Sequence, residues 1–205
     1  RLAKKLGAKT LAIVNAKGSS IARESDDVLY TWAGPEIAVA TTKAYSTQLQ
    51  ALYLIGLYLA ETKGTVSKER MNELINEFML IPSKLQQVLD NLKPLADYAA
   101  KHYNVKDAFY LGRGLDYCVA LEGSLKLKEI SYIHCEAMAA GELKHGTISL
   151  IENGTFVFAF GLGNYANKTL SNVSEVISRG GKVILFSQKE ESSECYKHIK
   201  TEKIE

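Results

Sequence analysis

DAFYLGRG, residues Asp107 to Gly114, is a compact apolar run that ends in two glycines flanking one arginine. Such a run suits a strand that is buried on both faces of a parallel sheet. The glycine turn leads directly into a long helical stretch that continues to about Ile133. Strand, glycine turn and helix in this order are typical of α/β proteins, in which helices cover the faces of a sheet.

Similar patterns lie on both sides of this stretch. Short apolar runs predict further strands at Lys9–Asn15, Asp27–Thr31, Thr155–Phe160 and Lys182–Ser187. Helical spacing predicts helices from Thr41 to Gly64, Ser67–Phe78, Pro82–His102 and Asn167–Ser178, with a break at Pro94. The helix before Gly64 is apolar nearly all round, so we expect it to be buried. The sequence therefore predicts an α/β fold with parallel sheets flanked by helices, in two halves (1–66 and 105–205) joined by a helical connector (67–104).

The composition is that of an ordinary globular protein, with 46% hydrophobic and 23% charged residues among 205. The 25 basic and 23 acidic residues nearly cancel and form no long run of one sign, so neither nucleic acid nor a membrane surface is an expected partner. Cys118, Cys135 and Cys195 have no metal-site or disulfide spacing, which favours a reducing, cytoplasmic setting. The most apolar stretch, Leu52–Ala60, is much shorter than the ~20 residues of a membrane-spanning helix.

Three charged residues share one face of the helix that follows DAFYLGRG. At about 100° per residue, Glu122, Lys126 and Glu129 fall at roughly 0°, 40° and −20°. They could form an exposed pair with a solvated neighbour, worth about 0.2–0.5 kcal/mol. They could also be a partly desolvated carboxylate and ammonium that move a proton as general base and acid. The spacing alone leaves both interpretations open.

A histidine lies in the small-residue stretch AAGELKHG, Ala139 to Gly146. His145 could donate and accept protons near neutral pH, although a loop histidine is often structural or merely exposed. We interpret His102, His134 and His198 as structural or merely exposed, because fewer residues suited to proton transfer surround them in the sequence.

Two turns before helices could bind an anion. Gly112-Arg113-Gly114 could offer backbone N–H groups, or could simply be a tight strand-to-helix turn. The stretch from Val39 to Lys43 offers hydroxyls and a cation for sugar or phosphate oxygens, although Thr41 or Thr42 could simply cap the helix.

Four of these stretches together resemble one known family. They are GSSIARESD (Gly18 to Asp26), AGPEIAVATTKAYSTQ (Ala33 to Gln48), LGRG (Leu111 to Gly114) and ALEGSLKLKEISYIHCEAMAAGELKHG (Ala120 to Gly146). The chain is similar to the isomerase half of the glutamine:fructose-6-phosphate aminotransferases, also called glucosamine-6-phosphate synthases. The last stretch is long enough to make the resemblance specific.

The resemblance implies tandem SIS (sugar isomerase) domains, each a flavodoxin-like, three-layer αβα sandwich around a parallel sheet. It implies a homodimer whose full-length chain also carries a glutaminase domain. That family converts fructose 6-phosphate and glutamine-derived ammonia to glucosamine 6-phosphate, without a metal or an organic cofactor.

The resemblance also implies roles for the charged residues. Glu129 resembles the base that moves a proton between C1 and C2 of the sugar, and Lys126 resembles its supporting ammonium. Glu122 matches the acidic position on the same face. His145 resembles the histidine that opens the sugar ring, which in this family reaches the site from the neighbouring subunit.

The stretch Val39, Ala40 and Thr41 resembles the family's sugar-contacting positions, where serine is common in place of the threonine. Two further departures concern the backbone: Ala38 stands where glycine is usual, and Thr147 where proline usually follows His-Gly. Both could alter how rigid these loops are.

Other parts of the family pattern are absent from this sequence. It has no Ser-Gln-Ser-Gly-Glu-Thr phosphate loop and no C-terminal lysine that forms the imine with the ketose. Arg1–Leu6 also resembles the end of a helix with nothing to start it. We therefore expect a piece of a longer chain, with both SIS domains incomplete, that makes no glucosamine 6-phosphate by itself.

Two other functions are consistent with the same residues. A fructosamine-6-phosphate deglycase or a metal-free phosphosugar isomerase could share the helix with the two carboxylates. A non-catalytic sugar-phosphate sensor could share the fold, but would not need Glu129 beside Lys126 and His145.

Overall fold

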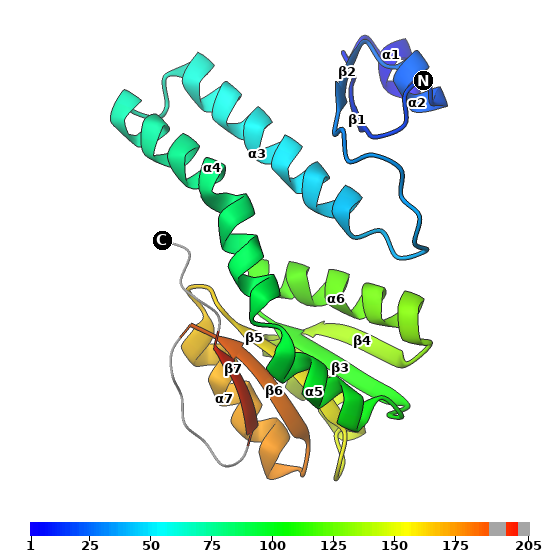
Figure 1. The fold of residues 1–205 in the computed structure, drawn as a ribbon, viewed down its shortest axis with the longest axis vertical. Coiled ribbons are helices and arrows are strands. Elements are labelled where there is room, and N and C mark those ends of the chain that lie inside the picture. Colours follow the sequence, from blue (N-terminus) through cyan, green and yellow to red (C-terminus); the bar gives the residue numbers. More distant parts are fainter. Residues whose placement is uncertain (189–195, 201–205) are drawn as a thin grey trace. The chain divides into compact units, whose positions relative to one another are not determined.

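The computed structural model describes residues 1–188 and 196–200, and the chain divides into two compact units, Arg1–Met79 and Leu80–Glu205 (Figure 1). The first unit holds two short parallel strands and the helices around them. The second holds a larger parallel sheet.

The first unit contains a two-stranded parallel sheet, β1 paired with β2 from Leu11↔Asp27 to Val14↔Tyr30. Its elements are α1 (Leu2–Lys5), β1 (Leu11–Val14), α2 (Ser20–Glu24), β2 (Asp27–Tyr30), α3 (Lys43–Lys63) and the start of α4 (Lys68–Asp90). Gly64 ends α3 with φ 60°, a left-handed conformation that glycine adopts without a steric penalty. The strands and the long helix predicted here are confirmed.

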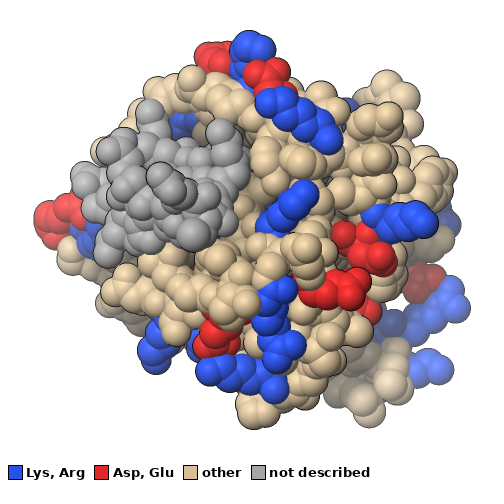
Figure 2. Space-filling model, turned by 90° about the horizontal axis from the view of Figure 1, so that it is seen from below, with Lys and Arg blue, Asp and Glu red and all other residues tan. Residues whose placement is uncertain are grey.

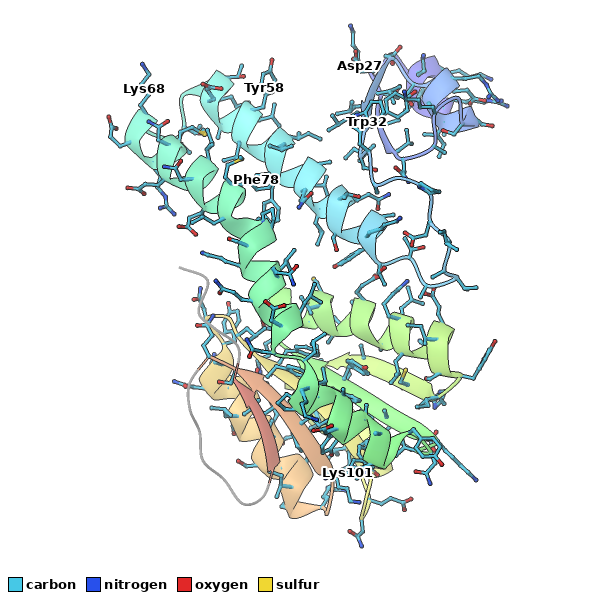
Figure 3. All side chains as sticks on the ribbon, in the orientation of Figure 1. Asp27, Trp32, Tyr58, Lys68, Phe78 and Lys101 are labelled. Carbon is cyan, nitrogen blue, oxygen red and sulfur yellow. The ribbon has the colours of Figure 1, made fainter. Side chains whose placement is uncertain are left out.

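The prediction that α3 is buried is wrong. Only Ala51 of this helix is buried, whereas Tyr58 is 67% exposed and Leu52 55%. Figure 3 shows side chains standing out around the helix, with Tyr58 labelled. The reason is the small amount of structure that packs on α3 within this unit, whose sheet has two short strands.

The prediction that one helix ends at Phe78 and another begins at Pro82 is also wrong. Helix α4 runs from Lys68 to Asp90 with Pro82 inside it, and the chain breaks at Asn91 and Leu92 instead. A proline removes a single N–H from the helix and its own φ is helical, so flanking turns can carry the helix past it. Pro94 lies in the first turn of α5 (Lys93–His102), where a missing N–H matters least, so the break predicted at Pro94 is confirmed.

The second unit is a five-stranded, all-parallel sheet in the order β4-β3-β5-β6-β7, with helices on both faces. Its elements after α5 are β3 (Asp107–Gly112), α6 (Leu115–Ser131), β4 (His134–Ala139), the 3-10 helices η1 (Ala140–His145) and η2 (Thr147–Leu150), β5 (Phe156–Gly161), α7 (Ala166–Ser178), β6 (Lys182–Ser187) and β7 (Tyr196–Lys200). The predicted fold class and the strands at 107, 155 and 182 are confirmed.

Alternate residues of β3 face opposite layers. Phe109 and Leu111 belong to the core cluster that includes residues of α7 and η1. Ala108 and Tyr110 belong to the cluster that includes Ala120 of α6. This period of two places β3 between two helical layers, as in a three-layer αβα sandwich.

Two strands were not predicted. Strand β4 lies at the edge of the sheet, and in its sequence HCEAMA only Cys135 is fully buried. An edge strand needs fewer apolar residues than a central one, so its sequence pattern is weak. Strand β7 lies at the opposite edge of the sheet and was not predicted either.

The surface charges are mixed. In Figure 2 basic and acidic side chains lie interspersed among uncharged residues, and no broad area of one sign is visible on this face. This agrees with the formal net charge of +2. Among the described residues, no helix is both long and apolar enough to cross a bilayer.

Candidate active site

The three charged residues predicted to share a face of α6 do meet. The Lys126 Nζ lies 2.6 Å from Glu129 Oε2 and 3.5 Å from Glu122 Oε1. The three side chains are 18–29% exposed, so they are not the exposed pair with a solvated neighbour that the spacing also allowed. One ammonium therefore lies between two carboxylates on a half-buried helix face.

The carboxylates hold the ammonium in its charged form. The hydrogen bond to Glu129 raises the pKa of Lys126, and the negative charges of Glu129 and Glu122 add to this effect, while burial acts in the opposite direction. Lys126 thus remains a cation throughout the physiological pH range. It can orient the Glu129 carboxylate and stabilise negative charge that develops beside it.

The start of α6 is fixed by close backbone contacts. A Cβ on Gly112 would lie 2.4 Å from the Asp116 carbonyl group, so the turn requires glycine at this position. Gly114 precedes the helix with φ 58°, again in the region that favours glycine.

The middle of α6 also lies close to the sheet. Gly123 lies against the Tyr110 ring, where a Cβ would be only 2.9 Å from the nearest ring carbon.

Asp116 was missed by the sequence analysis. Its side chain is buried, and its Oδ2 accepts hydrogen bonds from the backbone N–H groups of Leu162 at 3.0 Å and Gly163 at 3.1 Å. Asp116 therefore ties the first turn of α6 to the loop after β5. The only available signal was an acidic residue just after the Gly112-Arg113-Gly114 turn, because its partners lie 46 and 47 residues away along the chain.

His145 lies at the end of η1 on a loop that is held on several sides. Ala140 and Leu143 are fully buried, and Lys144 Nζ lies 2.9 Å from Glu175 Oε1 on α7. The His145 side chain itself is 74% exposed, and its Nε2 lies 3.9 Å from Glu142 Oε2. Among the described residues no interaction joins His145 to the carboxylates of α6, so the structure does not bring these predicted site residues together.

The predicted sugar-contacting residues lie in the first unit, just before α3. Val39 is 87% exposed and Thr41 is exposed, whereas Ala40 is buried between them. Thr42 occupies the N-cap position, but its side chain makes no capping hydrogen bond. The hydroxyls of this segment are therefore not used to cap α3.

Two other features lie away from these residues. A depression at the carboxyl ends of β5 and β6 includes none of the predicted site residues and is lined by Gly161, Leu162, Gly163, Asn164, Ala166, Asn167, Ser187 and Gln188. The part of the chain that is described contains no cluster of three or more residues suited to hold a metal ion.

Comparison with known proteins identifies the family. The model of the SIS domain matches residues 1–58 and 102–199. The chain belongs to the SIS domain family. This SIS chain is 58% identical over 187 residues to a glutamine–fructose-6-phosphate aminotransferase (isomerizing) of Caldanaerobacter subterraneus subsp. tengcongensis, covering 91% of this chain and 31% of that protein.

Two further proteins support the same relationship. A Clostridium tetani aminotransferase with the same printed name is 58% identical over 185 residues, covering 90% of this chain and 30% of that protein. The solved C-terminal domain of the glucosamine-fructose-6-phosphate aminotransferase of Francisella tularensis is 36% identical, with a TM-score of 0.83 over 98% of this chain and 58% of that one. This SIS chain thus spans about a third of the length of its curated relatives.

Proposed function

We propose that the chain is part of the isomerase module of a glutamine:fructose-6-phosphate aminotransferase. The observation that carries the proposal is the position of Lys126 between Glu122 and Glu129 on α6. Relatives that bear this enzyme's name share 58% of the aligned residues. The reaction would convert fructose 6-phosphate and ammonia from glutamine to glucosamine 6-phosphate.

In this proposal Glu129 is the general base. It takes a proton from C1 of the imine that the open-chain ketose and ammonia form with loss of water, and returns it to C2. The O1–H proton passes to the imine nitrogen, which leaves an aldehyde at C1 and an amine at C2. Lys126 holds the carboxylate in position and balances the negative charge that develops on the sugar. Glu122 holds the ammonium from its other side, so that Lys126 stays charged and oriented.

His145 would act earlier, as the acid and base that opens the sugar ring. Its imidazole is exposed and its loop is firmly held, which suits a histidine that reaches a sugar bound to the neighbouring subunit. Val39 and Thr41 would contact the sugar, with the Ala40 backbone between them.

The wider assembly is proposed from the same resemblance. Residues 1–66 would belong to a first SIS domain, 67–104 to a helical connector and 105–205 to a second SIS domain. The full-length protein would carry a glutaminase domain, form a homodimer in the cytoplasm and need no metal or organic cofactor. The relatives' greater length supports a longer parent chain.

The test is turnover by the full-length protein with Glu129→Gln. Because glutamine cannot accept the proton, kcat for glucosamine 6-phosphate should fall by about 10²–10⁴-fold while fructose 6-phosphate still binds. Glu152→Gln, the same change at an exposed glutamate of the same unit, is the matched control and should retain activity. Unchanged turnover in Glu129→Gln would remove the proton-transfer role.

The same assay separates the alternatives. A wild-type protein that binds the sugar phosphate without turnover would indicate a sensor. Consumption of a fructosamine 6-phosphate, or ketose–aldose conversion without glutamine, would indicate a deglycase or a phosphosugar isomerase. The 205-residue polypeptide, assayed beside the full-length protein, should yield no glucosamine 6-phosphate.

A further inference from the structure

Arg113 lies in the turn that starts α6, but its side chain contacts other elements. Its Nη2 donates a hydrogen bond of 2.9 Å to Oδ1 of Asn172 on α7, and Asn172 is 95% buried, at 5% exposure. Residues 113 and 172 are 59 positions apart along the chain. The side chain therefore crosses from the strand-to-helix turn to the opposite helical layer.

The guanidinium group also lies against η1. A Cβ added to Gly141 would lie 2.9 Å from Arg113 Nη1 and 3.3 Å from its Cζ. The backbone of Gly141 thus packs directly on the guanidinium, and any side chain at this position would displace it. This contact lies four residues before His145, in the same 3-10 helix.

The chemistry of this contact is unusual for a merely stabilising arginine. Within residues 1–188, the buried Nε of Arg113 has no hydrogen-bond partner and Arg113 forms no ion pair. A buried donor without a partner costs roughly 1–3 kcal/mol in stability. What the guanidinium does provide is a rigid plane between α7 and η1, which a flexible lysine ammonium cannot supply.

We propose that Arg113 is a positioning residue for the loop that carries His145. This inference rests on the proposed role of His145 in the reaction. The turn that contains Arg113 also begins α6, so one segment positions both the helix that carries Glu129 and the loop that carries His145. Loss of the guanidinium plane would leave η1 anchored by Leu143 and by Lys144, but free to shift at Gly141.

The experiment is a double-mutant cycle in the full-length protein between Arg113→Lys and His145→Ala. Arg113→Lys keeps the charge but loses the plane, so kcat should fall by about 10–100-fold with little change in KM. In the His145→Ala background the same substitution should lower kcat by less than about twofold, because the group it positions is already gone. Equal losses in both backgrounds would show that Arg113 only supports the fold, and would overturn the proposal.

Arg179→Lys is the matched control. Arg179 Nη1 donates to the Ile148 carbonyl oxygen at 3.1 Å, so it holds the same loop region beyond His145 with an exposed side chain. This variant should keep kcat within about twofold of wild type. A loss as large as that of Arg113→Lys would mean that any arginine beside the loop matters equally, which contradicts a special role for Arg113.

A second readout does not depend on turnover. Amide hydrogen exchange in Arg113→Lys should be faster in residues 140–146 and unchanged in α6. Unchanged exchange in 140–146 would overturn the proposal even if His145→Ala has no measurable activity. If the wild-type protein makes no glucosamine 6-phosphate, the proposed function fails, while the exchange experiment still decides whether Arg113 holds the loop.

Discussion

At the scale of single residues, the main electrostatic feature is the cation between two carboxylates on α6. The raised pKa of Lys126 arises first from its hydrogen bond to Glu129. A group whose pKa is higher in the folded than in the unfolded protein stabilises the fold below the unfolded pKa. That contribution is lost as the pH rises through the folded pKa.

Lys126→Met in the full-length protein should therefore change how stability depends on pH. The free energy of unfolding should be lower than that of wild type by a constant amount up to about pH 10, near the unfolded pKa of lysine. Above that pH the difference should shrink, because the wild-type lysine also loses its proton. Urea unfolding between pH 8 and 11.5 measures this, and a difference that stays constant to pH 11.5 would contradict it.

The sequence was informative about residues that interact within one helix. Glu122, Lys126 and Glu129 could be placed together because helix geometry alone brings residues three, four and seven positions apart onto one face. Asp116 and Arg113 could not be assigned this way, since their partners follow much later in the chain and depend on the packing of the whole sheet.

At the scale of elements, the close approach of α6 to the sheet depends on Gly123. The Tyr110 ring beneath it is itself stacked on Phe158, with ring centroids 4.7 Å apart, and cannot easily move away. The helix that carries the charged residues is therefore held at a distance from β3 that only a residue without a side chain permits.

Gly123→Ala should lower the free energy of unfolding of the second unit. Alanine favours a helix by up to about 1 kcal/mol over glycine, but forcing a methyl group into a packed contact typically costs about 1–3 kcal/mol. Gly161→Ala is the matched control, since a Cβ there meets its neighbours at 3.8 Å, an ordinary contact distance. Urea unfolding of both variants measures the effect. A Gly123→Ala protein as stable as wild type would show that the Tyr110 ring can move aside.

The elements themselves were predicted where their pattern is strong. The central strands β3, β5 and β6 are nearly continuous apolar runs, so their sequences identify them. Strand β4 was missed because an edge position leaves much of its surface exposed, and α4 was divided wrongly because proline statistics outweighed the flanking helical pattern.

At the scale of the whole molecule, buried apolar side chains are distributed unequally. In the first unit the buried apolar residues are mostly alanines, with Met71 the largest among those described. In the second unit Leu111, Leu143, Ile184 and Leu185 are almost completely buried. Since apolar burial is the main source of stability, the second unit should be the more stable part of this polypeptide.

Amide hydrogen exchange of the 205-residue polypeptide should reveal this difference. Slow exchange, with opening free energies close to that of global unfolding, is expected in β3, β5 and β6. The strands β1 and β2 should exchange through openings of much lower free energy, because their side chains bury little apolar surface. Equal protection of β2 and β5 would contradict the distribution of buried surface described above.

The strand order in the second unit also affects how the chain can fold during synthesis. Strand β3 pairs on one side with β4, beginning at Asp107↔His134, and on the other with β5, beginning at Ala108↔Phe156. On the ribosome, β3, α6 and β4 can emerge and assemble first, leaving the other edge of β3 unpaired until β5 follows. Such late, long-range pairing slows folding and prolongs the time for which an apolar strand edge is open to wrong partners.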